Sequence, residues 1–197
     1  MPHLSSDNRA ELIDALGEAQ RIGMLGDRSL DEVIDHSLPY ADLIPVSAQT
    51  VVDLGSGGGD PGLVIAMARP DLRLTLVDRR SKRTDLLVRL VGRLRLRDRV
   101  EVVEADVADL PRRFPDRRWD VVTCRGFGPP AYTAEHAAPL LADGGLLLVT
   151  EPPESDGSRW LDRAVTATGL AFVQVTAGVA ILNVPRGTSD TAPHPVP

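Results

Sequence analysis

Residues 53–62 read DLGSGGGDPG and mark the point where an apolar run over 50–54 stops at a row of glycines. The apolar run predicts a buried strand, and Pro61 suits the first turn of a helix, which we expect to end near residue 68. Glycines allow the backbone to turn sharply and to approach a ligand closely, and the N-terminus of a helix offers free N–H groups. This order of strand, glycine-rich turn and helix predicts a ligand-binding loop, and a plain surface turn is the less favoured alternative.

Strands and helices alternate along the chain beyond this loop. Apolar runs and helical spacing predict strands at 72–77, 100–104, 119–124 and 144–150, and helices at 80–96, 131–141 and 159–168. The last two strands, 170–176 and 179–184, are separated only by Ala177 and Gly178, which fits an antiparallel hairpin. We therefore expect an α/β fold with a doubly wound, Rossmann-like sheet that is mostly parallel, has helices on both faces and ends in an antiparallel hairpin.

The chain divides into three predicted segments. Helices near 7–25 and 29–40 form a short N-terminal helical extension over residues 1–45. Residues 46–184 form the α/β domain. The tail, 185–197, is rich in Pro, Thr and Ser, and we expect it to be disordered.

The composition limits the possible functions. The single cysteine, Cys124, excludes an internal disulfide, and no two histidines have a metal-ligand spacing, so we expect no metal site. A net charge of −6 does not favour general attraction to nucleic acid. The apolar runs are too short to span a bilayer, and Met1–Asp7 lacks the features of a secretory signal. We therefore expect a cytoplasmic protein without membrane contact.

Two acids follow the next two expected strands. Asp78 comes directly after 72–77, where a carboxylate can accept hydrogen bonds from both ribose hydroxyls of a nucleoside cofactor, although it can also cap the next helix. Asp106 follows the strand at 100–104, and its carboxylate or the neighbouring amides can hold the edge of an adenine ring. In a parallel sheet these positions share one edge, so the two acids predict a nucleoside site beside the glycine-rich loop.

Nucleoside binding alone leaves the reaction open. Gly57, Gly59 and Gly62 satisfy the pattern G-x-G-x-x-G of dinucleotide-binding enzymes. However, Gly55 follows its strand directly, Asp53 lies inside the strand end, and a C-terminal hairpin is usual in class I methyltransferases rather than in dehydrogenases. These features favour S-adenosylmethionine as the cofactor and methyl transfer as the reaction.

Four segments together resemble one family of methyltransferases. They are 52–63 (VDLGSGGGDPGL), 76–83 (LVDRRSKR), 119–126 (WDVVTCRG) and 138–145 (APLLADGG), and 34–38 adds a looser match. They are similar to the small-subunit ribosomal RNA guanine-N7 methyltransferases, also called the glucose-inhibited division protein B family. The resemblance covers about residues 34–151. It implies the class I methyltransferase fold, S-adenosylmethionine as cofactor, and ribosomal RNA or the small ribosomal subunit as partner.

The motifs and the resemblance together give a set of candidate site residues. The candidates for cofactor binding are Asp53, Gly55, Ser56, Gly57, Gly59, Asp78, Arg79, Asp106, Val107 and Arg125. Arg125 is also the candidate catalytic residue, because it follows the fourth strand, where an acceptor would meet the methyl group; there it would position a phosphate or a base edge. Guanine N7 carries no proton, so positioning is required and a general base is not. In the alternative, Arg125 pairs with Glu135 or Glu151 and only orders the loop.

Several positions depart from the family pattern where an acceptor would approach. Residues 151–153 (EPP) replace a usual lysine and glycine, and 126–130 (GFGPP) replace the usual alanine after Arg125. Together with the acidic net charge, these departures keep two alternatives open. One is a related methyltransferase with a small-molecule acceptor, and the other is a non-catalytic module that binds S-adenosylmethionine and regulates a partner.

The expected helix at 80–96 has an apolar stripe and a basic flank. The stripe is Leu86, Leu87, Leu90 and Leu94, and the flank is Lys82, Arg89 and Arg93. The flank is suited to RNA phosphates, but the acidity of the whole molecule favours a solvated face.

Overall fold

The computed structural model describes residues 4–186, and its centre is a mixed sheet of seven strands. The strands are β1 (Thr50–Leu54), β2 (Arg73–Asp78), β3 (Val100–Glu104), β4 (Trp119–Cys124), β5 (Leu141–Thr150), β6 (Ala171–Thr176) and β7 (Val179–Asn183). Their order across the sheet is β3-β2-β1-β4-β5-β7-β6, with β1 to β5 parallel and β7 antiparallel to both neighbours. The order reverses between β1 and β4, and ligands bind outside the carboxyl ends of strands at such a point.

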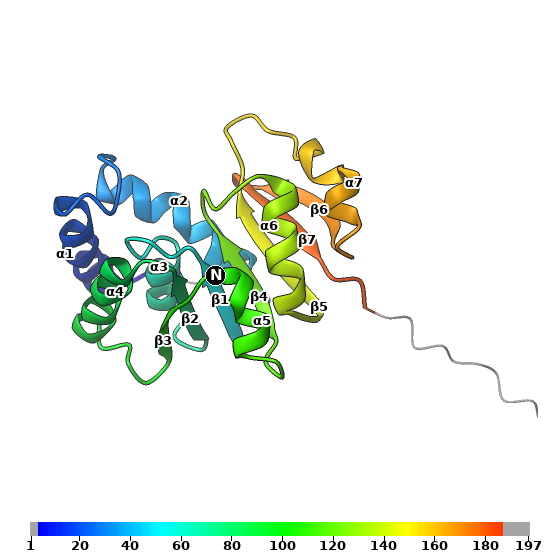
Figure 1. The fold of residues 1–197 in the computed structure, drawn as a ribbon. Coiled ribbons are helices and arrows are strands. Elements are labelled where there is room, and N and C mark those ends of the chain that lie inside the picture. The colour runs from blue at the N-terminus through cyan, green and yellow to red at the C-terminus, as the bar shows by residue number, and fades with distance from the viewer. Residues whose placement is uncertain (1–3, 187–197) are drawn as a thin grey trace, which may run out of the picture.

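Helices cover both faces of the sheet (Figure 1). They are α1 (Ser6–Arg21), α2 (Leu30–Leu43), α3 (Gly62–Ala68), α4 (Ser81–Arg93), α5 (Leu110–Arg113), α6 (Pro130–Ala137) and α7 (Arg163–Thr166), with 3-10 turns at Val107–Asp109, Ala138–Leu140 and Ser158–Leu161. Neighbouring residues of a strand point to opposite faces, so Val51 belongs to the hydrophobic cluster with α1 to α4, whereas Val52 belongs to the cluster with α5 to α7. The sheet therefore has a separate core on each face.

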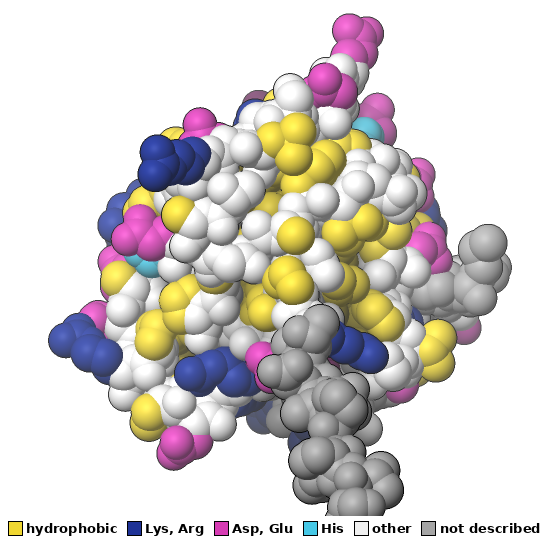
Figure 2. Space-filling model, turned by 90° about the vertical axis from the view of Figure 1, so that its right-hand side faces the viewer, with side chains coloured by type: hydrophobic (Ala, Val, Ile, Leu, Met, Phe, Trp, Pro, Cys, Tyr) yellow, Lys and Arg dark blue, Asp and Glu magenta, His cyan; other side chains and the backbone are white. Residues whose placement is uncertain are grey.

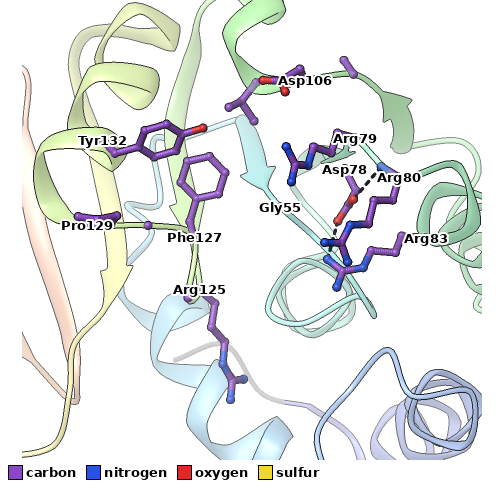
Figure 3. A pocket seen from close by; sticks show the side chains of 14 residues that line it. Gly55, Asp78, Arg79, Arg80, Arg83, Asp106, Arg125, Phe127, Pro129 and Tyr132 are labelled. Atoms are coloured by element: carbon purple, nitrogen blue, oxygen red, sulfur yellow. Dashed lines mark hydrogen bonds and ion pairs between the residues drawn. The ribbon is translucent and has the colours of Figure 1, made fainter.

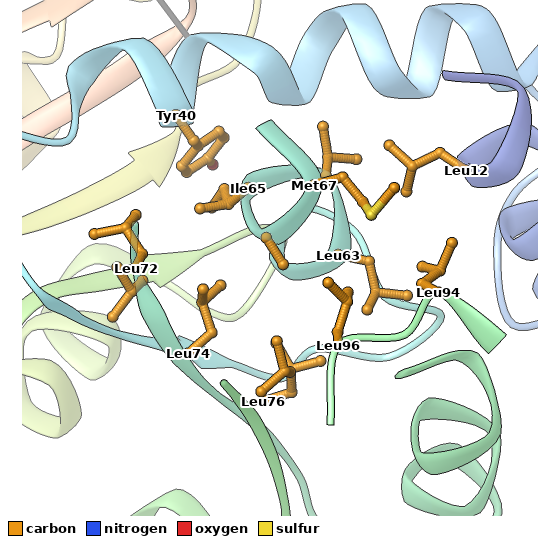
Figure 4. Close-up of a cluster of buried hydrophobic side chains, with 14 of the residues drawn as sticks. Leu12, Tyr40, Leu63, Ile65, Met67, Leu72, Leu74, Leu76, Leu94 and Leu96 are labelled. Atoms are coloured by element: carbon orange, nitrogen blue, oxygen red, sulfur yellow. The ribbon is translucent and has the colours of Figure 1, made fainter. Parts of the chain in front are cut away.

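The N-terminal helices share the first of these cores. Leu12 of α1 and Tyr40 of α2 are buried in one cluster with Leu63 and Met67 of α3 (Figure 4). Tyr40 Oη also donates a hydrogen bond to the carbonyl oxygen of Cys124 at 2.9 Å. This bond fixes α2 beside the carboxyl end of β4, next to the point where the strand order reverses.

The predicted fold class, the mostly parallel sheet and the hairpin at Ala177–Gly178 are confirmed. Ala177 and Gly178 both have positive φ, 49° and 74°, as a tight two-residue hairpin turn requires. The apolar stripe of α4 is also confirmed, because its four leucines are buried.

Several boundaries differ from the prediction, and four of the differences bear on the site or on the end of the domain. Asp78 is the last residue of β2 rather than the residue after it, and Pro61 precedes α3 rather than opening it. β5 begins at residue 141 instead of 144. The helix expected over 159–168 is two short pieces, because Asp162 has non-helical backbone and caps α7 by accepting a hydrogen bond from the Ala164 N–H at 2.7 Å.

The predicted disorder of the tail 185–197 concerns residues that, from 187 onward, lie outside the described part of the chain. Within residues 4–186, the longest helices are too short or too polar to cross a membrane.

Candidate functional site

The glycine-rich loop connects β1 to α3 and is tied to β2. Gly55, Gly57 and Gly59 have positive φ of 73°, 54° and 103°, a conformation that residues with a Cβ rarely adopt. Ser56 anchors the loop, because its Oγ donates to the carbonyl oxygen of Asp53 at 2.9 Å and accepts from the Val77 N–H at 3.1 Å. The loop is therefore fixed in a tight path at the carboxyl ends of β1 and β2.

Asp78 is buried at the end of β2 and accepts three hydrogen bonds. Its Oδ2 accepts from the Gly57 N–H at 3.0 Å and from Arg83 Nη1 at 3.2 Å, and its Oδ1 accepts from the Arg80 N–H at 3.0 Å. A carboxylate has about four acceptor positions, so capacity remains for a ligand hydroxyl. Asp78 thus joins the loop to the start of α4 through Arg80 and Arg83. The alternative role as a helix cap is wrong, because the N-cap residue of α4 is Arg80 and, among residues 4–186, no side chain caps the start of this helix.

Two adjoining cavities lie along the loop. The first, of about 390 Å³, is lined by Gly55, Asp78, Arg79, Arg80, Arg83, residues 105–107, residues 125–129 and Tyr132. Figure 3 shows Asp78 and Arg79 on one side of it and Phe127 and Tyr132 on the other. The second cavity, of about 410 Å³, is lined by residues 55–58, Asp60, Arg83, Arg125, Gly126, and, from the N-terminal part, residues 24–26, Arg28 and Val33. Because the cavities share Gly55 and Arg125, they adjoin at the end of β4.

Arg125 lies where these cavities meet a third one. The third cavity, of about 930 Å³, lies between Arg125, α2 and the loop after β5. The guanidinium of Arg125 forms an ion pair with Asp60 and donates a hydrogen bond to Ser37 Oγ at 3.3 Å. Its side chain points away from Phe127 and Tyr132 (Figure 3). The expected alternative, pairing with Glu135 or Glu151, is wrong, because Asp60 of the glycine-rich loop occupies that role.

Comparison with known proteins gives this arrangement a family. The chain matches the family described as rRNA small subunit methyltransferase G over residues 11–176. The chain belongs to this family. The resemblance expected from the four sequence segments is thereby confirmed.

Named members of the family differ from this chain in length. The ribosomal RNA small subunit methyltransferase G of Acidothermus cellulolyticus is 35% identical over 167 residues, which are 82% of this chain and 70% of that protein. The protein of the same name from a Nocardioides species is 42% identical over 130 residues, or 64% of this chain and 50% of that protein. The chain thus spans about half the length of several relatives that it matches.

Solved structures confirm the class I methyltransferase fold. An O-methyltransferase family protein from Burkholderia thailandensis has a TM-score of 0.61 at 20% identity, covering 94% of this chain and 74% of that one. An O-methyltransferase from Bacillus cereus, solved in complex with SAH, has a TM-score of 0.63 at 15% identity, covering 90% of this chain and 91% of that one. At these identities the similarity concerns the fold.

Eight of the ten candidate cofactor residues line the first two cavities. Gly55, Asp78, Arg79, Asp106, Val107 and Arg125 line the first, and Ser56 and Gly57 line the second. Asp106 is exposed, and its Oδ1 accepts a hydrogen bond from the Ala108 N–H at 3.1 Å, which caps the turn at 107–109. Asp53 and Gly59 line neither cavity.

Asp53 lies beneath the glycine-rich loop. It is 1% exposed, and its Oδ1 accepts a hydrogen bond from Thr123 Oγ1 at 2.7 Å. Its Oδ2 has no hydrogen-bond partner among the described residues. Burial raises the pKa of Asp53 to about 6. Asp53 therefore connects β1 to β4 through Thr123 and does not reach the cavities.

Glu151, which stands where the family usually has lysine, orders the loop after β5. Its side chain is buried; Oε1 accepts hydrogen bonds from Arg159 Nη2 at 2.7 Å and Trp160 Nε1 at 2.5 Å, and Oε2 accepts from Ser155 Oγ at 2.5 Å. Burial acts to raise the pKa of Glu151, but these hydrogen bonds outweigh it and lower the pKa below its usual value. Glu151 therefore holds one wall of the third cavity in place.

The basic flank of α4 is partly engaged by α1. Arg89 pairs with Glu18, and Arg93 pairs with Asp14 and Glu18, all near the surface. Lys82 is exposed at the start of α4. The flank is thus not the uniformly solvated face that the charge pattern favours.

The single cysteine lines none of the three cavities. Cys124 is fully buried in β4, and burial raises the pKa of its thiol. Across residues 4–186, no group of three or more His, Cys, Asp or Glu side chains is arranged to hold a metal ion.

Proposed function

We propose that the chain is an S-adenosylmethionine-dependent methyltransferase that acts on a guanine N7 of small-subunit ribosomal RNA. The observation that carries the proposal is the meeting of three cavities at Arg125, two along the glycine-rich loop and one beyond it. Family membership supports the choice of ribosomal RNA. Such a substrate implies a cytoplasmic enzyme.

The residues around the loop fit a nucleoside cofactor. A Cβ at Gly58 would lie 2.7 Å from the Leu25 side chain, so only a glycine allows the loop to pass beneath the N-terminal segment at the second cavity. In the first cavity, Asp78 would accept hydrogen bonds from ribose hydroxyls, and Asp106 with Val107 would hold the adenine edge. When bound, S-adenosylmethionine would supply a methyl group on a sulfonium, the group that a guanine N7 can accept without a general base.

Arg125 would position the acceptor. Asp60 and Ser37 fix its guanidinium between the cofactor cavities and the third cavity, where a guanidinium fits the phosphates or base edges of a nucleic acid. The charge of Asp60 keeps this arginine paired until an anion of the acceptor approaches. This chain would therefore contribute position and electrostatics rather than proton transfer.

Transfer of a radiolabelled methyl group to small ribosomal subunits that lack the native N7 mark tests the proposal. We expect label at one guanine, and about a 100-fold lower rate with Arg125→Ala, at the scale of removing one positioning charge. Calorimetry with S-adenosylhomocysteine should give a large loss of affinity for Asp78→Asn and a smaller one for Arg125→Ala, because Arg125 lines both cofactor cavities but its guanidinium is held by Asp60 and Ser37.

The other outcomes separate the alternatives. Cofactor binding without label in RNA would overturn the ribosomal substrate and favour a small-molecule acceptor, which the net charge of −6 supports. Absence of cofactor binding in the folded protein would overturn the methyltransferase assignment itself.

A further inference from the structure

Two aromatic side chains line the first cavity on the side opposite Asp78. Phe127 lies in the loop after β4 and Tyr132 in the first turns of α6, with ring centroids 5.6 Å apart and planes inclined by 35°. Tyr132 in turn packs on His136 at 4.2 Å. Tyr132 is 43% exposed, whereas the chain's largest aromatic residues, Trp119 and Trp160, are buried in the core. We call Phe127 and Tyr132 the aromatic wall. Phe127 is half-buried and packs against the second core, and both rings line the first cavity.

The aromatic wall lies directly above the glycine-rich loop. A Cβ at Gly55 would come within 3.1 Å of the Phe127 ring, so the ring and the loop are in close contact. Figure 3 shows the two rings on one side of the cavity, Asp78 and Arg79 on the other, and Asp106 between them at the top. The space between the rings and Asp78 is thus bounded by an apolar face on one side and by acids and arginines on the others.

The backbone around the wall is closely fitted to it. A Cβ at Gly128 would lie 2.8 Å from the Tyr132 ring, so the chain passes close against the ring, and a larger residue would require the ring to shift. Thr133 ties the same loop to α6, because its N–H donates to the carbonyl oxygen of Pro129 at 2.9 Å and its Oγ1 donates to that of Gly128 at 3.2 Å. The segment 126–130, which departs from the family pattern, therefore carries one ring, Phe127, and packs against the other, Tyr132.

We infer that the aromatic wall is a stacking face for a purine ring, and that this purine is the adenine of the cofactor; the inference rests on the proposed function. Planar rings prefer offset or tilted stacking, and an aromatic side chain can stack on either face of a base. The wall shares its cavity with Asp78 and Asp106, the two acids suited to a ribose and an adenine edge. The departure from the family pattern thus strengthens cofactor binding in this chain.

The alternative is that a purine of the acceptor stacks on the aromatic wall, since Phe127 also lines the third cavity. The cavity that holds Asp78 favours the cofactor, because Tyr132 lines that cavity and is not among the residues of the third. Binding measured without any acceptor separates the two sources.

The test is calorimetric titration of the full chain with S-adenosylhomocysteine. We expect Phe127→Leu, which keeps an apolar side chain but removes the ring, to weaken binding roughly 5- to 100-fold. Phe127→Trp should keep the affinity and show quenched indole fluorescence on binding, above the constant signal of Trp119 and Trp160. Phe172→Leu is the matched control, because Phe172 lies on β6 and lines none of the three cavities.

Each result decides a specific point. If Phe127→Leu binds S-adenosylhomocysteine as tightly as the wild type but has a raised KM for small ribosomal subunits, the wall serves the acceptor and the inference is overturned. Unchanged affinity and unchanged KM would also overturn it. Weakened cofactor binding by Phe127→Leu, together with a wild type that binds the cofactor but labels no RNA, would support the inference while overturning the ribosomal substrate.

Discussion

At the level of single residues, Asp53 places a titratable carboxyl beneath the loop, with Asp78 nearby. Burial raises the pKa of Asp53 from 3.8 to about 6, and the charge of Asp78 adds to this effect. Between these two values the folded protein holds a proton at Asp53 that the unfolded chain has released. The free energy of unfolding therefore falls as pH rises through this window, by roughly 3 kcal/mol in total for the fully buried group.

We expect Asp53→Asn to remove this fall in stability, because the amide does not titrate. Urea denaturation of the wild type and the variant from about pH 4 to pH 7 measures the difference in slope. Asp71→Asn is the control: a hydrogen bond from Arg69 lowers the pKa of Asp71, so that carboxyl adds stability that is lost only as pH falls below 3.8. A wild type whose stability is flat between pH 4 and 6 would contradict the expectation.

The contacts of the site show what single residues do not reveal in a sequence. Asp78 and the glycine-rich loop were predictable, because a strand, a turn and an acid form a local pattern. The pair Arg125–Asp60 joins positions 65 apart, and the contact with Ser37 joins positions 88 apart. Nothing local distinguishes these partners from Glu135 or Glu151, since the choice depends on where α2 and the loop pack.

At the level of elements, all seven strands were predictable from apolar runs. Six of them contain buried residues, and β6, which has none, follows from its hairpin with β7. The turn at 107–109 and helix α5 were not predicted, since three or four residues are too few to show a period. The helix expected at 159–168 fails for a tertiary reason. Glu151 accepts hydrogen bonds from Arg159 and Trp160 and so ties the segment to the position directly after β5, and the chain turns at Asp162 before it forms α7.

We predict that Glu151→Lys, which introduces the usual family residue, destabilises the loop after β5. The lysine would face Arg159 and leave the buried Trp160 Nε1 without its acceptor, at a cost of about 3 kcal/mol, the low end for a broken buried pair because Arg159 reaches solvent. Urea denaturation measures the loss. Glu154→Lys, an exposed change in the same loop, should stay within about 0.5 kcal/mol of the wild type. Equal stability of the two variants would show that the Glu151 network contributes nothing.

At the level of the whole molecule, the distribution of charge matters more than its sum. Arg89, Arg93 and Arg95 of the α4 region are paired with acids of α1. The face that carries β6 and β7 shows dispersed basic side chains among apolar ones, with no continuous basic patch in the described part of the chain that it displays (Figure 2). Arg79, Arg80 and Lys82 are exposed at and beside the rim of the first cavity, and no ion pair is seen for them among residues 4–186.

These rim cations predict that RNA binding weakens only moderately as the salt concentration rises, and that this effect comes from Arg79, Arg80 and Lys82. A cation that neutralises a phosphate of single-stranded RNA contributes about 0.7 to the slope of log K against log salt, so three rim cations contribute about 2. Fluorescence anisotropy of a labelled small-subunit RNA fragment, at saturating S-adenosylhomocysteine and between about 50 and 200 mM KCl, measures this slope.

The triple variant Arg79→Ala, Arg80→Ala, Lys82→Ala should lose most of this slope. The matched variant Arg89→Ala, Arg93→Ala, Arg95→Ala removes the same charge from positions already neutralised by α1, and its slope should equal that of the wild type. A larger loss of slope in the second variant would show that the RNA contacts α4 and would contradict the prediction. An unchanged slope in both variants would show that neither set of cations contacts RNA phosphates, so that only the third cavity would receive the acceptor.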